Sequence, residues 1–391
     1  MKSASKIPAS RAASGTLLAL CLMTVSGVWY EDLFGATLGS LIADVRNNRA
    51  NTSEAGKATQ KYYEDLITDE DETAGGVADA IAAPEERQRG GPRDVIQKSG
   101  ATRDTDDFLP WELIPNTSII FKGVPLEVNA FGHRDGTDYT QAKPEGTFRI
   151  ALAGGSNTMG SGVPVELTFA HLLEERLNDE LAGGAFRRYE VINFSVGGYH
   201  LPERLFVVQN KVAAFDPDLI LVGATDRDLT IQHERLARKF ARGNKEPIDL
   251  AFLKKIIRQA GVKRRDELDR MVRKLQPFQE DILLGCLEEL ARYSRDHDVA
   301  LAVFLLRREG GHSLGKDLQA TYQILKRGEV TILPLFESYE GVGEMELWLQ
   351  PHPNPDLGDP HPNKEGHRRI ADDLYNQLMA DATIRALLRG D

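Results

Sequence analysis

The sequence predicts an α/β fold in which helices cover both faces of a parallel sheet. Apolar runs of strand length alternate with longer segments whose apolar residues recur at helical spacing. Gly-rich or polar turns directly follow the first three of these apolar runs. Alternating strands and helices form parallel sheets that are buried on both faces. Ligands of such sheets bind beyond the carboxyl ends of the strands, so we expect a functional site among these turns.

Five apolar runs are the predicted strands, and the segments between them are the predicted helices. The strands, with the turns that follow the first three, lie at residues 147–156, 189–199, 217–229, 299–308 and 330–336. The predicted helices lie at residues 164–181, 201–215, 279–297 and 318–328, and a last helix follows Gly366.

Residues 230–276 lack strand character, and their apolar spacing predicts a helical insertion. From residue 235 to residue 274 the chain has fourteen Lys or Arg against five Asp or Glu, within a protein of net charge −11. One interpretation is a solvated helical surface. The other is a cap over the site that attracts an anionic polymer or lipid headgroups. The acidic charge of the whole chain argues against nucleic acid as a partner.

The N-terminal region predicts export or attachment to a membrane. Three basic residues among the first eleven precede a stretch, residues 12–30, without any charged residue. Residues 1–30 therefore have the pattern of a signal peptide or signal-anchor, with a buried N-terminal helix as the alternative. Positively charged residues that flank a membrane segment stay on the cytoplasmic side, so the rest of the chain would face outward. Residues 31–107 combine Gly, Pro and alternating charge, which is typical of a stalk or linker. Residues 108–391 are the predicted domain.

Ser156 follows the first predicted strand within a Gly-rich turn. A serine there has its Oγ exposed at the end of the strand, where backbone N–H groups can point at an oxyanion. A phosphate-binding loop or a simple helix cap is the alternative for this turn. A serine nucleophile needs a base, and the base needs an acid that orients it. His361 and Asp359, in the segment DPHPNKEGH, can supply both, unless that segment only caps the last helix.

Four segments, in order along the chain, resemble the four sequence blocks of the SGNH, or GDSL-like, hydrolase superfamily. They read GGSNTMGSGV, VINFSVGGY, PDLILVGATDRDL and DPHPNKEGH. The resemblance covers residues 108–391 without the basic insertion, and it includes a lead-in that contains VNAFGHRDG. It implies a flavodoxin-like three-layer α/β/α fold and the hydrolysis of esters, often acetyl groups on carbohydrates or acyl chains.

The resemblance also implies a triad. Ser156 matches the nucleophile, His361 the base that takes its proton, and Asp359 the acid that orients the base. The family's usual spacing is Asp-x-x-His, whereas this chain has Asp-x-His. Asp356 is therefore the alternative acid, and His352 could trade places with His361.

The implied oxyanion hole uses the backbone N–H groups of Ser156 and Gly198, or of Gly197 if the register slips by one. Arg227 stands where the third block has an asparagine, whose side chain donates to the oxyanion; a register shifted by two would place Thr225 there. Arginine can also donate, and its fixed charge could stabilise an oxyanion. Gly155 replaces the aspartate of the namesake motif, a tolerable change because that aspartate is not the nucleophile.

The remaining histidines favour structural roles. His367 should pack or cap the last helix, and His133 should stabilise its loop. No spacing of His, Cys, Asp and Glu resembles a metal site, so neither a metal nor another cofactor is expected.

Together these features predict an SGNH-type serine esterase in the cell envelope or outside the cell. Its expected substrate is a cell-envelope or extracellular polysaccharide that carries O-acetyl or other short acyl groups. Arg227 suggests one alternative, a catalytically weak module that binds polysaccharide or takes part in its assembly. An acyltransferase with the same triad is the other, because acceptor choice depends on the exclusion of water.

Overall fold

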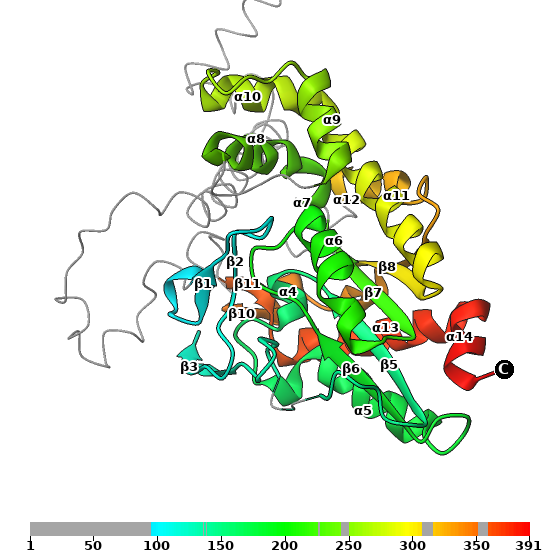
Figure 1. Cartoon of the computed structure of the whole chain (residues 1–391). Helices are drawn as coiled ribbons and strands as arrows, with labels where there is room; N and C mark the ends of the chain where they lie inside the picture. Colours follow the sequence, from blue (N-terminus) through cyan, green and yellow to red (C-terminus); the bar gives the residue numbers. More distant parts are fainter. Residues whose placement is uncertain are drawn as a thin grey trace, which may run out of the picture. The chain divides into compact units, whose positions relative to one another are not determined.

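The computed structural model describes residues 95–391, except residues 136, 138, 226, 244–249, 307–315 and 351–358 (Figure 1). The predicted leader, residues 1–30, lies outside the described residues, as does the predicted stalk up to residue 94. Within the part of the chain that is described, no helix is long and apolar enough to cross a bilayer.

A five-stranded parallel sheet forms the centre of the fold, in the order β6-β5-β7-β8-β9 (Figure 1). The strands are β5 (Thr147–Ala153), β6 (Arg188–Asn193), β7 (Leu219–Ala224), β8 (Ala300–Leu306) and β9 (Thr331–Leu335). In order of appearance along the chain this is 2-1-3-4-5, the strand order of flavodoxin-like sheets. Every residue of β5 and β7 is buried, as expected for strands that are covered on both faces. The predicted fold class is confirmed.

Helices on the two faces of the sheet enclose two separate apolar cores. On one face lie α5 (Phe169–Leu181), α13 (Lys364–Ala380) and α14 (Ala382–Arg389), and on the other α6 (Leu201–Asn210), α11 (Gln279–His297) and α12 (Lys316–Leu325). Alternate residues of a strand point to opposite faces. Accordingly, Ile150 and Leu152 of β5 belong to the first core, and Ala151 and Ala153 belong to the second.

The basic segment between β7 and α11 is helical, as predicted. It contains α7 (Arg227–Thr230), α8 (Gln232–Arg242), α9 (Ala251–Gln259) and α10 (Leu268–Leu275), and α8 to α10 lie together at the top of Figure 1. Each of the three longer helices buries apolar residues, among them Leu236, Leu253 and Met271. Lys239 of α8 donates to the carbonyl oxygen of Phe108 at 2.5 Å, so at least one of these basic residues is structural.

Two antiparallel hairpins precede the sheet. They pair β1 (Thr102–Asp104) with β2 (Trp111–Leu113), and β3 (Ser118–Phe121) with β4 (Val124–Glu127). The boundary that we predicted between residues 107 and 108 falls inside the first hairpin. Ile96 and Ala101 are buried in the core of the α6 face, so residues 95–107 pack on the domain and are not part of a stalk. Residues 95–107 pack on the domain because several of their side chains are apolar. The charged residues among them made this stretch resemble a stalk in the sequence.

Short 3-10 helices lie between these elements, at Ile96–Lys98, Val165–Leu167, Val212–Phe215, Gln276–Phe278, Glu337–Tyr339 and Glu344–Leu347.

Arg149 of β5 places a charge in the interior of the protein. Its side chain is completely buried, and its Nε donates to Oε2 of Glu190 on β6 at 2.8 Å. The guanidinium also donates to the carbonyl oxygens of Phe215 at 2.6 Å and Gln141 at 3.0 Å. A buried charge is tolerated only when it is paired and hydrogen-bonded, so this pair should be essential to stability.

Replacing Glu190 by Gln should therefore lower the free energy of unfolding by about 3–5 kcal/mol, because Arg149 would keep its charge without a counter-charge. Glu329→Gln is the matched control, since Glu329 pairs with Arg295 at 3.1 Å on the exposed surface. It should change the free energy by no more than about 1 kcal/mol. Urea denaturation followed by circular dichroism measures both, and equal effects would contradict the argument.

Candidate functional site

Ser156 lies at the carboxyl edge of the sheet, where α4 (Ser156–Met159) begins just after β5. Two glycines separate strand and helix because there is no room for side chains. A Cβ on Gly154 would overlap the side chain of Thr158. A Cβ on Gly155 would lie 2.9 Å from the carbonyl oxygen of Tyr199 and 3.1 Å from Nη2 of Arg204. This crowding explains why glycine, and not aspartate, precedes Ser156 in this chain.

His361 and Asp359 lie on β11 (Asp359–Pro362), which pairs antiparallel with β10 (Trp348–Gln350). The following Asn363 is the N-cap of α13, and its Oδ1 accepts from the backbone N–H groups of Glu365 at 3.0 Å and Gly366 at 3.1 Å. The helix thus begins at Lys364, earlier than the start after Gly366 that we predicted. The DPHPNKEGH segment therefore both caps a helix and presents the acid and the histidine.

The structure brings Ser156, His361 and Asp359 together. Nε2 of His361 lies 2.9 Å from Oγ of Ser156, and Nδ1 of His361 lies 2.6 Å from Oδ1 of Asp359. The backbone N–H of His361 also donates to Oδ1 of Asp359, at 3.1 Å. Both residues are buried, with exposed fractions of 4% for His361 and 8% for Asp359. This is the geometry of a hydroxyl nucleophile, a base and an orienting acid.

His367 and His133 lie in other surroundings. Asp356 and His352 lie outside the described residues. His367 is completely buried, and its Nδ1 accepts from the backbone N–H of Phe169 at 3.1 Å. His133 is buried beside the ring of Phe194, with ring centroids 4.3 Å apart. No cluster of three or more potential metal ligands occurs in the described ranges.

Asp359 has a second partner that sequence reasoning missed. Nζ of Lys122 donates to Oδ2 of Asp359 at 2.7 Å. Burial by itself would raise the pKa of Asp359, but the charges of His361 and Lys122 and their hydrogen bonds outweigh it and hold this pKa well below its ordinary range. The carboxylate is therefore ionised wherever the protein is folded near neutral pH. In the sequence, Lys122 is followed by a glycine, which is typical of a turn. This pattern does not predict a contact with Asp359.

The loop after β6 places Gly198 beside Ser156. Gly198 has φ +85°, and an added Cβ would lie 2.6 Å from Cζ2 of Trp111. Nε1 of Trp111 donates to the carbonyl oxygen of Gly197 at 3.0 Å, and Nη2 of Arg204 donates to that of Tyr199 at 2.8 Å. These bonds fix the loop on both sides of Gly198.

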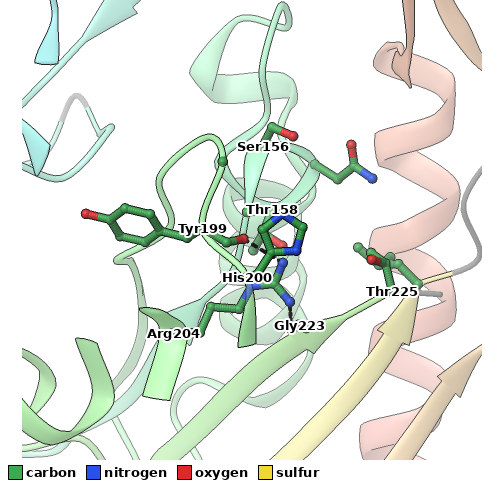
Figure 2. Close-up of a pocket in the computed structure, with 11 residues that line it drawn as sticks. Ser156, Thr158, Tyr199, His200, Arg204, Gly223 and Thr225 are labelled. Atoms are coloured by element: carbon green, nitrogen blue, oxygen red, sulfur yellow. Dashed lines mark hydrogen bonds between the residues drawn. The ribbon is translucent and has the colours of Figure 1, made fainter. Parts of the chain in front are cut away.

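Figure 2 shows the cavity at this edge of the sheet, whose lining includes Ser156, Gly198, Tyr199, His200, Arg204 and Thr225. Of the two glycine candidates, Gly198 is in the lining. Of the two third-block candidates, Thr225 is in it. Among the described residues that line the cavity, Arg227 is absent, because it lies half-buried at the start of α7. The alignment that places Thr225 at the third-block position therefore agrees with the cavity lining better than our preferred alignment, which places Arg227 there.

A buried ion pair lies beneath the cavity. Asp228 is completely buried, and its Oδ2 accepts from Nη1 of Arg204 at 2.7 Å and from the backbone N–H of Thr225 at 2.8 Å. Burial would raise the pKa of Asp228, but the positive charge of Arg204 and the hydrogen bond from His200 lower it overall. Nη1 of Arg204 also donates to the carbonyl oxygen of Gly223 at 2.6 Å, which is one of the dashed contacts in Figure 2. The Arg204 side chain therefore connects the loop that follows β6 to the carboxyl end of β7.

No protein-family model and no curated protein matches the chain. Solved structures do match its fold. A structure described as TesA has 15% identity and TM-score 0.38, covering 59% of this chain and 98% of its own. The esterase EstA from Pseudoalteromonas sp. has 16% identity and TM-score 0.37, covering 59% and 97%. A putative SGNH hydrolase from Slackia heliotrinireducens has 13% identity and TM-score 0.33, covering 59% and 99%.

The contribution of Asp359 to stability should depend on pH. Its folded-state pKa lies below the unfolded value of about 3.9, so its carboxylate stabilises the fold above that pH and ceases to do so as the pH falls through the folded-state value. We expect the difference in unfolding free energy between wild type and Asp359→Asn to shrink as the pH falls below about 4.

Asp373 is the control, because its contribution to stability should change with pH in the opposite direction to that of Asp359. Burial raises the pKa of Asp373 against the hydrogen bonds from Ser338, so its ionised form opposes folding. The difference between wild type and Asp373→Asn should therefore shift in favour of wild type as the pH falls from neutral. Parallel trends for both variants, in urea denaturation at each pH, would contradict the assignment of Asp359.

Proposed function

We propose that this protein is a serine esterase. The observation that carries the proposal is the 2.9 Å contact between Ser156 Oγ and Nε2 of a histidine whose other ring nitrogen lies 2.6 Å from a buried carboxylate. A serine hydroxyl is a weak nucleophile until a neighbouring base takes its proton. Each of the three groups is placed for the role that this chemistry requires.

In the proposed mechanism, Ser156 Oγ attacks the carbonyl carbon of an ester while His361 Nε2 takes the hydroxyl proton. The backbone N–H groups of Ser156 and Gly198 donate to the oxyanion. The tetrahedral intermediate then collapses, and His361 returns the proton to the departing alcohol. Water, deprotonated by His361, attacks the acyl-enzyme, and the second collapse releases the acid and restores the serine hydroxyl. Asp359 holds the ring with Nδ1–H toward itself and stabilises the imidazolium.

The third oxyanion donor in this proposal is Thr225. Its hydroxyl belongs to the cavity lining, and its contact with Oδ2 of Asp228, at 3.4 Å, is long enough to be exchanged for a substrate oxygen. Arg227 was our first choice for this role, but its place on α7 outside the lining favours Thr225.

The proposed substrate is a polysaccharide of the cell envelope or extracellular space that carries short acyl esters such as O-acetyl groups. Two features support it. The N-terminal 30 residues have the pattern of an export or anchoring segment. The basic helices α8 to α10 follow from the carboxyl end of β7, the edge of the sheet that holds the site, and would attract an anionic polymer. The protein would then act outside the cytoplasm, attached to the membrane or secreted.

Replacing Ser156 by Ala should lower kcat for p-nitrophenyl acetate by about 10⁶-fold, because it removes the hydroxyl that contacts Nε2 of His361 and would form the acyl-enzyme. It should also abolish covalent labelling by a fluorophosphonate probe. Ser118→Ala, at an exposed position on β3, is the control and should behave as wild type. Labelling that survives in Ser156→Ala would remove Ser156 from the mechanism.

The same assay separates the alternative functions. Tight glycan binding by a wild-type protein that neither labels nor turns over would favour a binding module. Faster release of p-nitrophenol in the presence of a carbohydrate acceptor, with the acyl group recovered on that acceptor, would favour an acyltransferase.

The choice between Thr225 and Arg227 is testable by side-chain replacement. Thr225→Val keeps the β-branched shape but removes the hydroxyl, and it should lower kcat by about 10²-fold with little change in KM. Thr225→Asn restores an amide donor and should exceed Thr225→Val in kcat. Arg227→Ala should stay near wild type. A large loss of kcat in Arg227→Ala, with none in Thr225→Val, would return the role to Arg227.

A further inference from the structure

Lys122 contacts both the acid and the base of the site. Its Nζ lies 2.7 Å from Oδ2 of Asp359 and 3.2 Å from Nδ1 of His361. The side chain is only 7% exposed, so water screens these contacts weakly. Asp359 thus uses one oxygen for His361 and the other for a buried ammonium group.

The backbone at Lys122 is unusual for a lysine. Lys122 and Gly123 connect β3 to β4, and their φ values are +51° and +79°. A two-residue hairpin turn with both φ values positive strongly prefers Asn, Asp or Gly at its first position. Lysine therefore occupies this position against the local preference, and the turn directs its side chain to Asp359. The stem passes beside Gly162, where an added Cβ would lie 3.3 Å from Cδ of Lys122.

We infer that Lys122 is a positioning residue of the triad, which fixes Asp359 through Oδ2 and lets His361 act as a base at lower pH than an Asp–His pair alone would. The inference rests on the proposed function for its consequence in catalysis. A cation 3.2 Å from the ring disfavours a second positive charge on the imidazole, and it also neutralises part of the Asp359 charge that would stabilise imidazolium. Both effects favour the neutral ring, which is the form that can accept the serine proton.

The other ionisable groups around His361 leave this role to Lys122. His367 lies on α13 behind the site, and burial lowers its pKa to about 3, so it is neutral. Arg134 keeps its charge, because burial lowers its pKa only to about 10, but its guanidinium donates to the carbonyl oxygens of Met159, Gly160 and Val163. Asp359 supplies the negative charge. Of these groups, Lys122 is the cation whose Nζ lies within 3.2 Å of both Asp359 and His361.

The test compares pH profiles of kcat/KM for p-nitrophenyl acetate in the full chain. Lys122→Met removes the charge and the donor, and Lys122→Gln removes the charge but keeps a donor. Both should move the midpoint of the acid limb to higher pH, by about one unit. Lys122→Arg keeps the charge and should keep the midpoint near wild type. Lys143→Met is the matched control, since Lys143 forms a partly buried pair with Asp218 at 2.7 Å, at the opposite edge of the sheet.

A measurement that needs no turnover separates this inference from the proposed function. ¹⁵N-histidine NMR titration gives the protonation midpoint of His361, whose signal is assigned by its loss in His361→Gln. A midpoint that rises in the neutral Lys122 variants supports the inference, even in a protein that does not hydrolyse the ester. Active wild-type enzyme whose acid limb and NMR midpoint are the same in Lys122→Met, Lys122→Gln and wild type would overturn it and leave the esterase proposal standing.

Discussion

The contact between Ser156 and His361 depends on where parallel strands end. Every strand of the central sheet runs in one direction, so the turns that follow β5, β6 and β7 meet at one edge. Ser156, Gly198 and Thr225 each follow one of these strands, and they line one cavity for that reason. His361 comes from outside the sheet, and the β10–β11 pairing and the Asn363 cap bring it to the same edge. A serine and a histidine 205 positions apart thus meet without any sequence between them being specialised for it.

Buried charge fixes the loops at this edge. Arg204 and Asp228 would each be costly to bury alone, and backbone groups add hydrogen bonds to both members of the pair. Asp228 accepts from the backbone N–H groups of Thr225 and Leu201, and Arg204 donates to the carbonyl oxygens of Gly223 and Tyr199. An apolar pair of the same volume would fill the space but could not hold these four backbone groups, which lie at the end of β7, at the start of α6 and in the turns that follow β6 and β7. The ion pair therefore serves the orientation of the loops more than the stability of the core.

The sequence was informative where one physical signal dominates. The strands are mostly apolar, so their runs were recognisable, and their alternation with helices predicted the fold class. Ser156, Asp359 and His361 were named because a serine follows a buried strand, an acid and a histidine precede the last helix, and both segments resemble blocks of one hydrolase superfamily. The third-block residue could not be fixed from the sequence because Thr225 and Arg227 are only two positions apart, and the side chain that lines the cavity depends on where β7 ends. The contacts of Lys122 and Arg204 were not predictable, since they cross 237 and 24 positions and have no periodic signal.

The segment before the sheet, residues 95–134, is part of the site even though none of its residues is a proposed nucleophile, acid or base. Trp111 contacts the loop that carries Gly198, Lys122 holds Asp359, and Arg134 donates to the carbonyl oxygens after α4. Each of these three side chains acts on a different element of the site. An α/β sheet that began at residue 147 would keep its two apolar cores on either face, because β5 to β9 and their helices supply most of them. It would lose the contacts that orient the glycine loop, the carboxylate and the turn after the serine. The fold therefore depends mainly on the sequence from residue 147 onward. The geometry of the site also depends on residues 95–134.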